Sequence, residues 1–380
     1  MPKVLRIINR FNLGGPTYNA ANLTKYMAHD FETKLIGGKH EEGEISSTYI
    51  NDSLGISYEV LPHLQRSINY KTDKLAYREI KEIIKNFKPD IVHTHASKAG
   101  AIGRLAAHNS KVPVIVHTFH GHVFHGYFGK AKTQVYKEVE RNLAKRSHAI
   151  VAISREQKRE LTEVHKICSS NQTHVIPLGF DLNRFREGRA EKRNSFRKKW
   201  NIPDETFAIG IIGRFAPIKN HFFFLDVMEK LKGKNIIGVL IGDGDEKQSI
   251  IAKAKEKGIK QNLIFTSWIK NIDEAIPGLD AVVLTSDNEG TPVSLIEAQA
   301  SAKPVLSTNV GGVQDIVLHD KSGFVLQKGD LDGFVKHLIE LETSEELCRK
   351  MGQAGEKWAF SNFTAERLAA DMKDLYLSLL

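Results

Sequence analysis

The feature of this sequence that most constrains its fold is an alternation of short, almost continuously apolar segments with amphipathic helical patterns. Strands that are apolar on both faces are typical of parallel sheets covered by helices on both sides. Such segments lie at residues 4–8, 33–37, 57–61, 90–95, 112–120, 149–154 and 173–179, and again at 207–214, 236–244, 263–267, 281–286, 304–310 and 323–326. Two successive sets predict an α/β chain with two doubly wound domains, which bind ligands outside the carboxyl ends of their strands.

A charged stretch at 182–194 interrupts this apolar rhythm and marks the predicted domain boundary. We therefore expect a first domain at 1–185 and a second at 186–362. The last segment, 363–380, has a helical pattern with Thr364 in the position of an N-cap.

The composition is that of an ordinary globular enzyme, with 380 residues of which 41% are hydrophobic and 26% charged. The sequence has no apolar run of the ~18–20 residues that span a bilayer, and its N-terminal strand follows no signal-peptide core. Its two cysteines, Cys168 and Cys348, make neither a disulfide framework nor a metal cage. These features predict a cytoplasmic protein.

The chain is basic, with a formal net charge of +9, and much of that charge lies at 130–148 and 188–200. Glutamates among the basic residues of the first stretch favour a solvated helix face. The alternative is loose docking of these helices on an anionic membrane surface. The sequence contains no recognisable nucleic-acid-binding motif, so nucleic acid is not an expected partner.

Two glycine-bearing segments point to a phosphate ligand. After the strand at 207–214 come Gly213, Arg214 and Lys219, and two fixed cations there would stabilise charge that gathers on a departing diphosphate. Gly14 and Gly15 precede a predicted helix N-terminus, which favours anions. The glycine-bearing strand end at 241–246, which contains Gly242 and an Asp-Gly-Asp turn, lacks the third glycine of a dinucleotide fingerprint, so a nicotinamide cofactor is not expected.

Two glutamates lie in the segment 286–312. Glu289 follows a strand in a polar loop, and Thr291 and Pro292 are predicted as N-cap and first residue of a helix that carries Glu297 among apolar neighbours. A carboxylate in an apolar helix needs a partner, and the hydroxyls of a ribose would serve. A glycosidase with paired carboxylates remains an alternative, since the spacing does not exclude the ~5–5.5 Å that retaining hydrolases require.

Histidines are dense after two neighbouring strands. His93 and His95 end one strand, and the loop that follows the next contains four more, His117, His120, His122 and His125. Zinc is the alternative that this density raises, but no metal-binding signature accompanies the histidines, and strand alternation points His117 and His120 in opposite directions. We expect one or two of these side chains at the ligand site, with His120 the foremost candidate.

Taken together, these motifs resemble glycosyltransferase family 4, the retaining nucleotide-sugar transferases with the GT-B fold. The resemblance covers essentially the whole chain, and its most specific motif is EGTPVSLIEAQA at 289–300. It implies two Rossmann-like domains whose parallel sheets face a central cleft, with the acceptor on the side of the first domain and the nucleotide sugar held by the second. It also implies that the C-terminal helix crosses back to the first domain.

The resemblance further implies roles for the residues that match the family's motifs. Arg214 and Lys219 match the diphosphate-binding pair, Glu297 the ribose-binding glutamate, and Glu289 the glutamate near the donor sugar. His120 matches the histidine beside the reacting carbon. The catalytic candidates are therefore His120, Glu289, Arg214 and Lys219, and the donor-binding candidates are Gly14, Gly15, Gly213, Arg214, Lys219, Gly242, Gly290, Thr291, Pro292, Val293 and Glu297.

The expected function is retaining, metal-independent transfer of a hexose, without a cofactor, from a UDP-sugar to a hydroxyl of a glycan or lipid-linked acceptor. Segments 93–107 and 117–128 look particularly like those of bacterial members that build surface polysaccharides, which fits peripheral contact with the inner face of the membrane. The alternatives are a nucleotide-sugar epimerase of the same fold and a non-catalytic protein that binds sugar nucleotides.

Overall fold

The computed structural model describes residues 1–12, 15–41, 46–65, 67–121 and 129–380, which form two compact units. Unit 1 contains Met1–Phe180 and Thr364–Leu380, and unit 2 contains Asp181–Phe363. The chain passes from unit 1 to unit 2 between Phe180 and Asp181, before the predicted boundary at residue 185. The reason is that the short helix η2 (Asn183–Phe185) packs on unit 2. There Ser301 Oγ lies 3.4 Å from the Phe185 carbonyl oxygen and donates to it.

Unit 1 is built on a parallel sheet of seven strands in the order β3-β2-β1-β4-β5-β6-β7. The strands are β1 (Lys3–Arg10), β2 (Glu32–Gly38), β3 (Tyr58–Leu61), β4 (Ile91–His95), β5 (Val114–Phe119), β6 (Ala149–Ala152) and β7 (Thr173–Val175). The helices are α1 (Gly15–Tyr26), α2 (Thr48–Ser53), α3 (Tyr70–Phe87), α4 (Ser97–Asn109), α5 (Lys130–Ala144), α6 (Arg155–Arg159), η1 (Glu160–Val164) and α15 (Ala365–Leu379).

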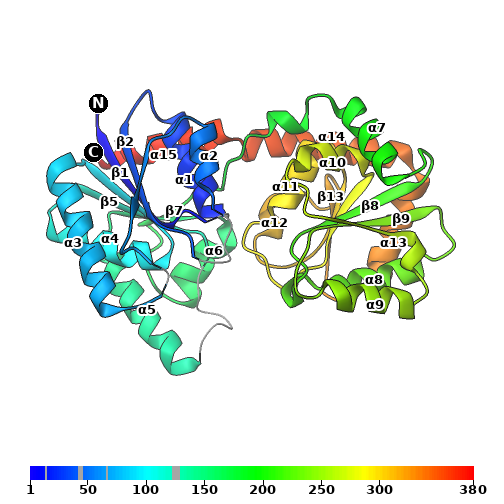
Figure 1. Cartoon of the computed structure of the whole chain (residues 1–380), viewed down its shortest axis with the longest axis horizontal. Helices are drawn as coiled ribbons and strands as arrows, with labels where there is room; N and C mark the ends of the chain where they lie inside the picture. Colours follow the sequence, from blue (N-terminus) through cyan, green and yellow to red (C-terminus); the bar gives the residue numbers. More distant parts are fainter. Residues whose placement is uncertain (13–14, 42–45, 66, 122–128) are drawn as a thin grey trace. The chain divides into compact units, whose positions relative to one another are not determined.

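The sheet of unit 1 is covered on both faces, which explains why its strands are apolar throughout. Leu5 and Ile7 of β1 pack with α3 and α4, whereas Val4 packs with α1 and α15. The helices α3, α4 and α5 therefore form one layer, and α1 and α15 form the other (Figure 1).

The C-terminal helix α15 is a structural part of unit 1. Thr364 caps it, with its Oγ1 accepting from the Arg367 amide at 3.2 Å, as predicted. The buried Tyr376 hydroxyl shares a 2.6 Å hydrogen bond with His93 Nδ1 and accepts from Arg6 at 3.3 Å. These contacts join the end of the chain to β1 and β4, in the centre of the sheet.

Unit 2 contains a parallel sheet of six strands in the order β10-β9-β8-β11-β12-β13. The strands are β8 (Phe207–Ile212), β9 (Ile236–Ile241), β10 (Leu263–Ser267), β11 (Ala281–Leu284), β12 (Val305–Thr308) and β13 (Gly323–Leu326). The longer helices are α7 (Arg189–Trp200), α8 (His221–Lys230), α9 (Lys247–Glu256), α11 (Val293–Ala300), α13 (Leu331–Thr343) and α14 (Glu345–Asn362). The short helices are η3 (Pro217–Lys219), η4 (Lys260–Asn262), α10 (Ile272–Ala275), η5 (Ile276–Gly278) and α12 (Val313–Ile316).

Helices cover this sheet on both sides as well. Side chains of α8, α9 and α13 pack with Ile209 and Ile211 of β8 in one apolar core, and α10 and α11 lie on the other side of the sheet (Figure 1). In both units all strands run parallel, so the carboxyl ends of each sheet's strands lie at one edge. That edge is where the predicted site residues should gather within each unit.

Candidate active site

The centre of the site in unit 2 is an ion pair between Lys219 and Glu289. Lys219 Nζ lies 2.5 Å from Glu289 Oε1, and Ser286 Oγ donates to the same carboxylate oxygen at 2.6 Å. The Glu289 side chain is 9% exposed and that of Lys219 27% exposed, so the ammonium keeps one side toward solvent. The structure thus brings together two of the predicted catalytic residues, which are seventy positions apart in the sequence.

The sheet order explains why these two residues meet. Lys219 follows β8 and Glu289 follows β11, and these strands are neighbours in the sheet. Thr285 Oγ1, buried just after β11, donates to the carbonyl oxygens of Lys219 at 3.1 Å and Asn220 at 3.0 Å. The loop that carries the lysine is therefore held against the strand that carries the glutamate.

Arg214 follows Gly213 at the end of β8 and is exposed. Its guanidinium forms no hydrogen bond or ion pair with any residue that the structure describes. The next residue, Phe215, is fully buried and anchors the backbone beneath it. Such an arginine, on a fixed backbone and with all its donors available, suits a phosphate ligand.

The glycines beside this site allow close backbone approach. A Cβ on Gly242, whose φ is +152°, would lie 1.9 Å from the Gly213 carbonyl oxygen, so the ends of β8 and β9 approach closely only because of this glycine. Asp243 accepts hydrogen bonds from Lys247 Nζ at 2.6 Å and Ser267 Oγ at 2.9 Å, and these bonds lower the pKa of its carboxyl group. The Asp-Gly-Asp segment is thus a hydrogen-bonded turn in this structure.

A second glycine, Gly311, shapes the loop of Glu289. It has a φ of +50°, and a Cβ there would lie 1.7 Å from the Glu289 carbonyl oxygen. The next amide, that of Gly312, donates to the Gly290 carbonyl oxygen at 3.1 Å. The loop after β12 therefore supports the loop after β11. Sequence reasoning missed Gly311 and Ser286, although the glycine pair after the strand at 304–310 is a visible turn feature.

The helix α11 begins one residue later than predicted. Pro292, not Thr291, is its N-cap, and Val293 is its first residue. The prediction was wrong because Pro292 has an extended ψ of 92°, which leaves it outside the helix, while its carbonyl oxygen accepts from the Leu295 amide at 3.1 Å. Gly290 and Thr291 accordingly belong to the loop that joins Glu289 to this helix.

Glu297 lies on the second turn of α11 and is 15% exposed. Its carboxylate lies 3.8 Å from Arg184 Nη2, and it forms no hydrogen bond or ion pair with Lys219 or Glu289 among the described residues. Burial raises the pKa of Glu297 to about 7; Arg184 opposes this and Asp273 adds to it. The sequence predicted that this carboxylate needs a partner. Arg184, at 3.8 Å, supplies that partner only in part.

At the carboxyl edge of unit 1, the buried His95 and the half-buried His120 form a pair. His95 Nδ1 and His120 Nε2 are 3.0 Å apart, and their rings stack at 5.3 Å. Burial lowers the pKa of His120 to about 3, and it also lowers that of His95 well below the usual value. Both imidazoles are therefore neutral at physiological pH, and His95 Nε2 and His120 Nδ1 have no hydrogen-bond partner among the described residues.

Two other predicted histidines are structural. His93 bonds to Tyr376 and to Thr118, and His117 Nδ1 lies 2.8 Å from Thr94 Oγ1, against α4. His122, His125 and Gly14 lie outside the described residues, and Gly15 is the first residue of α1.

In the described part of the chain, no three or more His, Cys, Asp or Glu side chains are arranged to hold a metal ion. Over the same residues, every helix is too short or too polar to cross a bilayer.

Comparison with solved structures identifies the class of this fold. Solved structures with the same architecture include a glycosyltransferase from Rickettsia africae, with a TM-score of 0.84, 19% identity and coverage of 100% of this chain and 98% of the other. Anabaena Alr3699/HepE in complex with UDP has a TM-score of 0.83 and 18% identity, with coverage of 99% and 100%. The chain thus has the GT-B fold of glycosyltransferases.

Sequence comparison gives the family. The family model "Glycosyltransferase Family 4" matches residues 14–184, and "Glycosyl transferases group 1" matches residues 192–358. These two matches span most of both units, and the chain belongs to the family 4 glycosyltransferases.

Bacterial relatives cover nearly the whole chain. The UDP-Gal:alpha-D-GlcNAc-diphosphoundecaprenol alpha-1,3-galactosyltransferase of Escherichia coli is 28% identical over 89% of this chain and 87% of its own length. The capsular polysaccharide biosynthesis glycosyltransferase CapM of Staphylococcus aureus is 26% identical over 82% of this chain and 84% of its own length.

Proposed function

We propose that this glycosyltransferase transfers a hexose from a UDP-sugar to a hydroxyl group, with retention of configuration and without a metal ion. The observation that carries the proposal is the Lys219–Glu289 contact of 2.5 Å at the carboxyl edge of the unit 2 sheet, together with Arg214, which pairs with none of the described residues. A flexible ammonium and an exposed guanidinium at one strand end form a cationic site for a diphosphate.

Arg214 and Lys219 stabilise the leaving group. As the bond between the sugar carbon and the diphosphate oxygen breaks, negative charge grows on that oxygen, and fixed cations stabilise this state more than the ground state. The acceptor oxygen bonds to the same carbon from the same face, and its proton passes to the departing phosphate. The atoms and charges balance without a side-chain nucleophile or an added metal or cofactor.

The remaining residues of unit 2 bind the donor. Glu289, oriented by Ser286 and Lys219, accepts hydrogen bonds from hexose hydroxyls, and Glu297 accepts from the ribose diol. The backbone of Gly213 and Gly242 makes room for the nucleotide. The loop and helix start at Gly290, Thr291, Pro292 and Val293 contact the diphosphate-sugar.

In unit 1, His120 acts beside the reacting carbon. Its pKa of about 3 keeps it a neutral hydrogen-bonding group, and His95 orients it. Gly15, at the start of α1, offers its backbone amide to the diphosphate. The sequence motif assigns the same role to Gly14, which lies outside the described residues.

The acceptor in this proposal is a glycan or a lipid-linked glycan of a surface polysaccharide. The E. coli relative is named for a diphosphoundecaprenol-linked sugar, and the S. aureus relative for capsular polysaccharide. The proposed location is the cytoplasm, with peripheral contact to an anionic membrane and no nucleic-acid partner.

Substitution of the two cations tests the proposal. We expect Lys219→Ala and Arg214→Ala to lower turnover by roughly 10²–10³ with a UDP-sugar donor, as for other preorganised charge stabilisers. Lys257→Ala is the matched control, because this lysine pairs with Asp226 and Glu229 at the far end of α9. Wild-type turnover in both test variants would refute the assigned role.

The alternatives give different results in the same assays. An epimerase converts the donor without any acceptor, and a non-catalytic binding protein is stabilised by UDP without sugar transfer. A chelator should leave the rate unchanged, whereas loss of activity that zinc restores would favour a histidine-bound metal.

A further inference from the structure

A small pocket lies at the amino edge of the unit 2 sheet, opposite the edge that carries Lys219 and Glu289. Its volume is about 290 Å³, and it is lined by residues at the starts of β8, β11 and β12 and by residues of α13 and α14. Among them are an amine, that of Lys303, and a thiol, that of Cys348. The proposed transfer chemistry uses neither.

Lys303 reaches the pocket from the turn between α11 and β12. Its amide donates to the Ala298 carbonyl oxygen at 3.0 Å, and Ala302 before it has a left-handed φ of 56°. On the other side of the turn, Gly352 of α14 lies so close that a Cβ there would be 2.1 Å from the Ala302 carbonyl oxygen. The backbone of Lys303 is therefore fixed between two helices.

The amine of Lys303 forms no hydrogen bond or ion pair with any residue that the structure describes, although the side chain is only partly exposed. The nearby carboxylate of Asp280 is engaged on both oxygens. Its Oδ1 accepts from Arg193 at 2.9 Å. Its Oδ2 accepts from Arg197 at 2.5 Å and from the Ala208 amide at 2.8 Å. Lys303 thus lies next to an ion-pair network without taking part in it.

These surroundings favour the uncharged form of the amine. Burial lowers the pKa of Lys303 from the ordinary 10.5 to about 8, and Asp280 opposes this effect. The guanidinium groups of Arg189, Arg193 and Arg197 add to it. About half of the Lys303 side chains are therefore neutral at pH 8, whereas a lysine of ordinary pKa is neutral in about one molecule in three hundred.

Three more charged side chains border the pocket: Glu342 near the end of α13, and Glu345 and Arg349 at the start of α14. Neither glutamate forms an ion pair with Lys303, and both lack ion pairs within the described part of the chain. An anionic group in the pocket would face these two carboxylates, so a neutral group fits there better.

The thiol in the pocket does not compete with the amine. Cys348 Sγ donates to the Leu341 carbonyl oxygen at 3.2 Å, and burial raises the pKa of this thiol to about 11. The thiolate, not the thiol, is the nucleophile, so this sulfur is unreactive at neutral pH. An electrophile that enters the pocket therefore meets the amine of Lys303 as its reaction partner.

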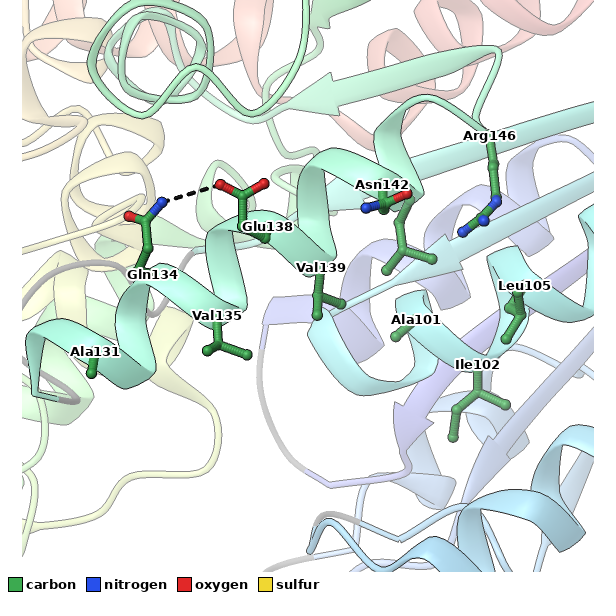
Figure 2. Close-up of a pocket in the computed structure, with 11 residues that line it drawn as sticks. Ala101, Ile102, Leu105, Ala131, Gln134, Val135, Glu138, Val139, Asn142 and Arg146 are labelled. Carbon is green, nitrogen blue, oxygen red and sulfur yellow. Dashed lines mark hydrogen bonds between the residues drawn. The ribbon is translucent and has the colours of Figure 1, made fainter.

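A larger groove of unit 1 lacks such a nucleophile. It has a volume of about 750 Å³ and lies between α4 and α5, where Figure 2 shows Ile102 and Leu105 pointing toward Val135 and Val139. None of the described residues that line it is a lysine or a cysteine. The helix α5 thus has an apolar side as well as the solvated charged face that its sequence predicted.

We propose that Lys303 is a covalent acylation site, at which the amine takes a small neutral acyl group from an acyl phosphate or an acyl thioester. The nitrogen lone pair attacks the carbonyl carbon, and a nitrogen–carbon bond forms. The bond from that carbon to the phosphate oxygen or thioester sulfur breaks, and the leaving group departs with the electron pair. The proton from nitrogen passes to the leaving group or to water. The product is an uncharged amide, and the inference is independent of the proposed transfer reaction.

Acylation of the purified full chain tests this site. The protein is incubated at pH 8 with acetyl phosphate in one arm and acetyl-coenzyme A in the other, and peptide mass spectrometry follows the acetyl occupancy of each lysine. The neutral fraction of Lys303 is about 150 times that of a lysine of ordinary pKa. If amines follow the dependence of thiols, the lower nucleophilicity of the weaker base reduces this advantage about 10- to 18-fold. We therefore expect Lys303 to react about tenfold faster than the exposed Lys198 and Lys234 of the same unit.

The pH dependence of labelling provides a second readout. The rate at Lys303 should level off above about pH 8, whereas the rate at a solvated lysine keeps rising about tenfold per pH unit to about pH 9.5. Lys303→Arg should remove the label at this position without changing Lys198 and Lys234, and Cys348→Ser should leave the label in place. Reaction at Lys303 no faster than at the two reference lysines in both arms would overturn the site. Loss of the label in Cys348→Ser would also overturn it.

Thermal unfolding checks the cost of the charge without any acyl donor. Between pH 8 and pH 10.5 the unfolded state holds a proton at position 303 that the folded state has lost, so the stability of the wild type rises with pH in this range. Lys303→Gln, which resembles the acylated side chain, should have a higher Tm than the wild type at pH 7, and this advantage should shrink by pH 10. Lys234→Gln is the control and should follow the wild type. Parallel Tm profiles of Lys303→Gln and the wild type would contradict the proposal.

Discussion

The raised pKa of Glu297 makes both stability and nucleotide binding depend on pH. Its folded pKa is about 7, against an ordinary value of 4.5. Between pH 4.5 and pH 7, Glu297 therefore keeps its proton in the folded state but has lost it in the unfolded state. Folding stability consequently falls as the pH rises through this range. At about 1.4 kcal/mol for each pKa unit, the whole loss amounts to about 3.5 kcal/mol, of which about 2.5 kcal/mol falls between pH 5 and pH 8.

Glu297→Gln should remove this loss, because an amide keeps the shape of the protonated acid at every pH. We expect the stability of the wild type, measured by urea unfolding, to fall by about 2.5 kcal/mol more than that of the variant between pH 5 and pH 8. Glu205→Gln, at an exposed carboxylate of the same unit, is the control and should follow the wild type.

The same group should control nucleotide affinity in the opposite direction. If the ionised carboxylate accepts from the ribose, it is about one-eleventh ionised at pH 6 and ten-elevenths at pH 8, so UDP should bind about tenfold more tightly at pH 8 by this effect. UDP binding is measured by calorimetry for the wild type and for Glu297→Gln at each pH. The difference between the two proteins separates the contribution of Glu297 from the protonation of UDP itself. Parallel pH profiles of the two proteins, in stability and in UDP affinity, would refute the reasoning.

Two further predictions concern the loops around the site. Gly311→Ala should lower the Tm and reduce turnover, because its Cβ would lie 1.7 Å from the Glu289 carbonyl oxygen. Gly329→Ala is the control, because φ at Gly329 is +82° and nothing lies within 4 Å of the added Cβ. This control should lose only the backbone strain energy of about 1 kcal/mol. His120→Ala should lower kcat with little change in Tm. Because the pKa of His120 is about 3, the pH–rate profile of the wild type should show no inflection near pH 6.5 from this residue. A wild-type inflection near pH 6.5 that the variant loses would contradict the inference that burial lowers the pKa of His120.

Much of the fold follows from the strand pattern. Every predicted strand is present, with ends that differ by a few residues, because buried parallel strands are nearly continuous apolar runs. The meeting of Lys219 with Glu289 is also predictable in outline, since each follows a parallel strand and such strands end at one sheet edge.

Other features depend on packing that one sequence does not display. The contact of Arg184 with Glu297 joins residues more than a hundred positions apart, through the packing of η2 on unit 2. The start of α11 was misplaced because proline favours the first helical position, whereas Pro292 has an extended ψ and takes the N-cap position here.

The location of α15 in unit 1 has a consequence for biosynthesis. Leu368, Met372 and Tyr376 fill the same core as β1, β4 and β5, although more than two hundred residues are translated between β5 and this helix. The nascent N-terminal half therefore leaves the ribosome with one sheet face covered by α1 but not yet by α15, while the sequence of unit 2 is complete by Phe363. The domain that is synthesised first is thus the last to complete its core.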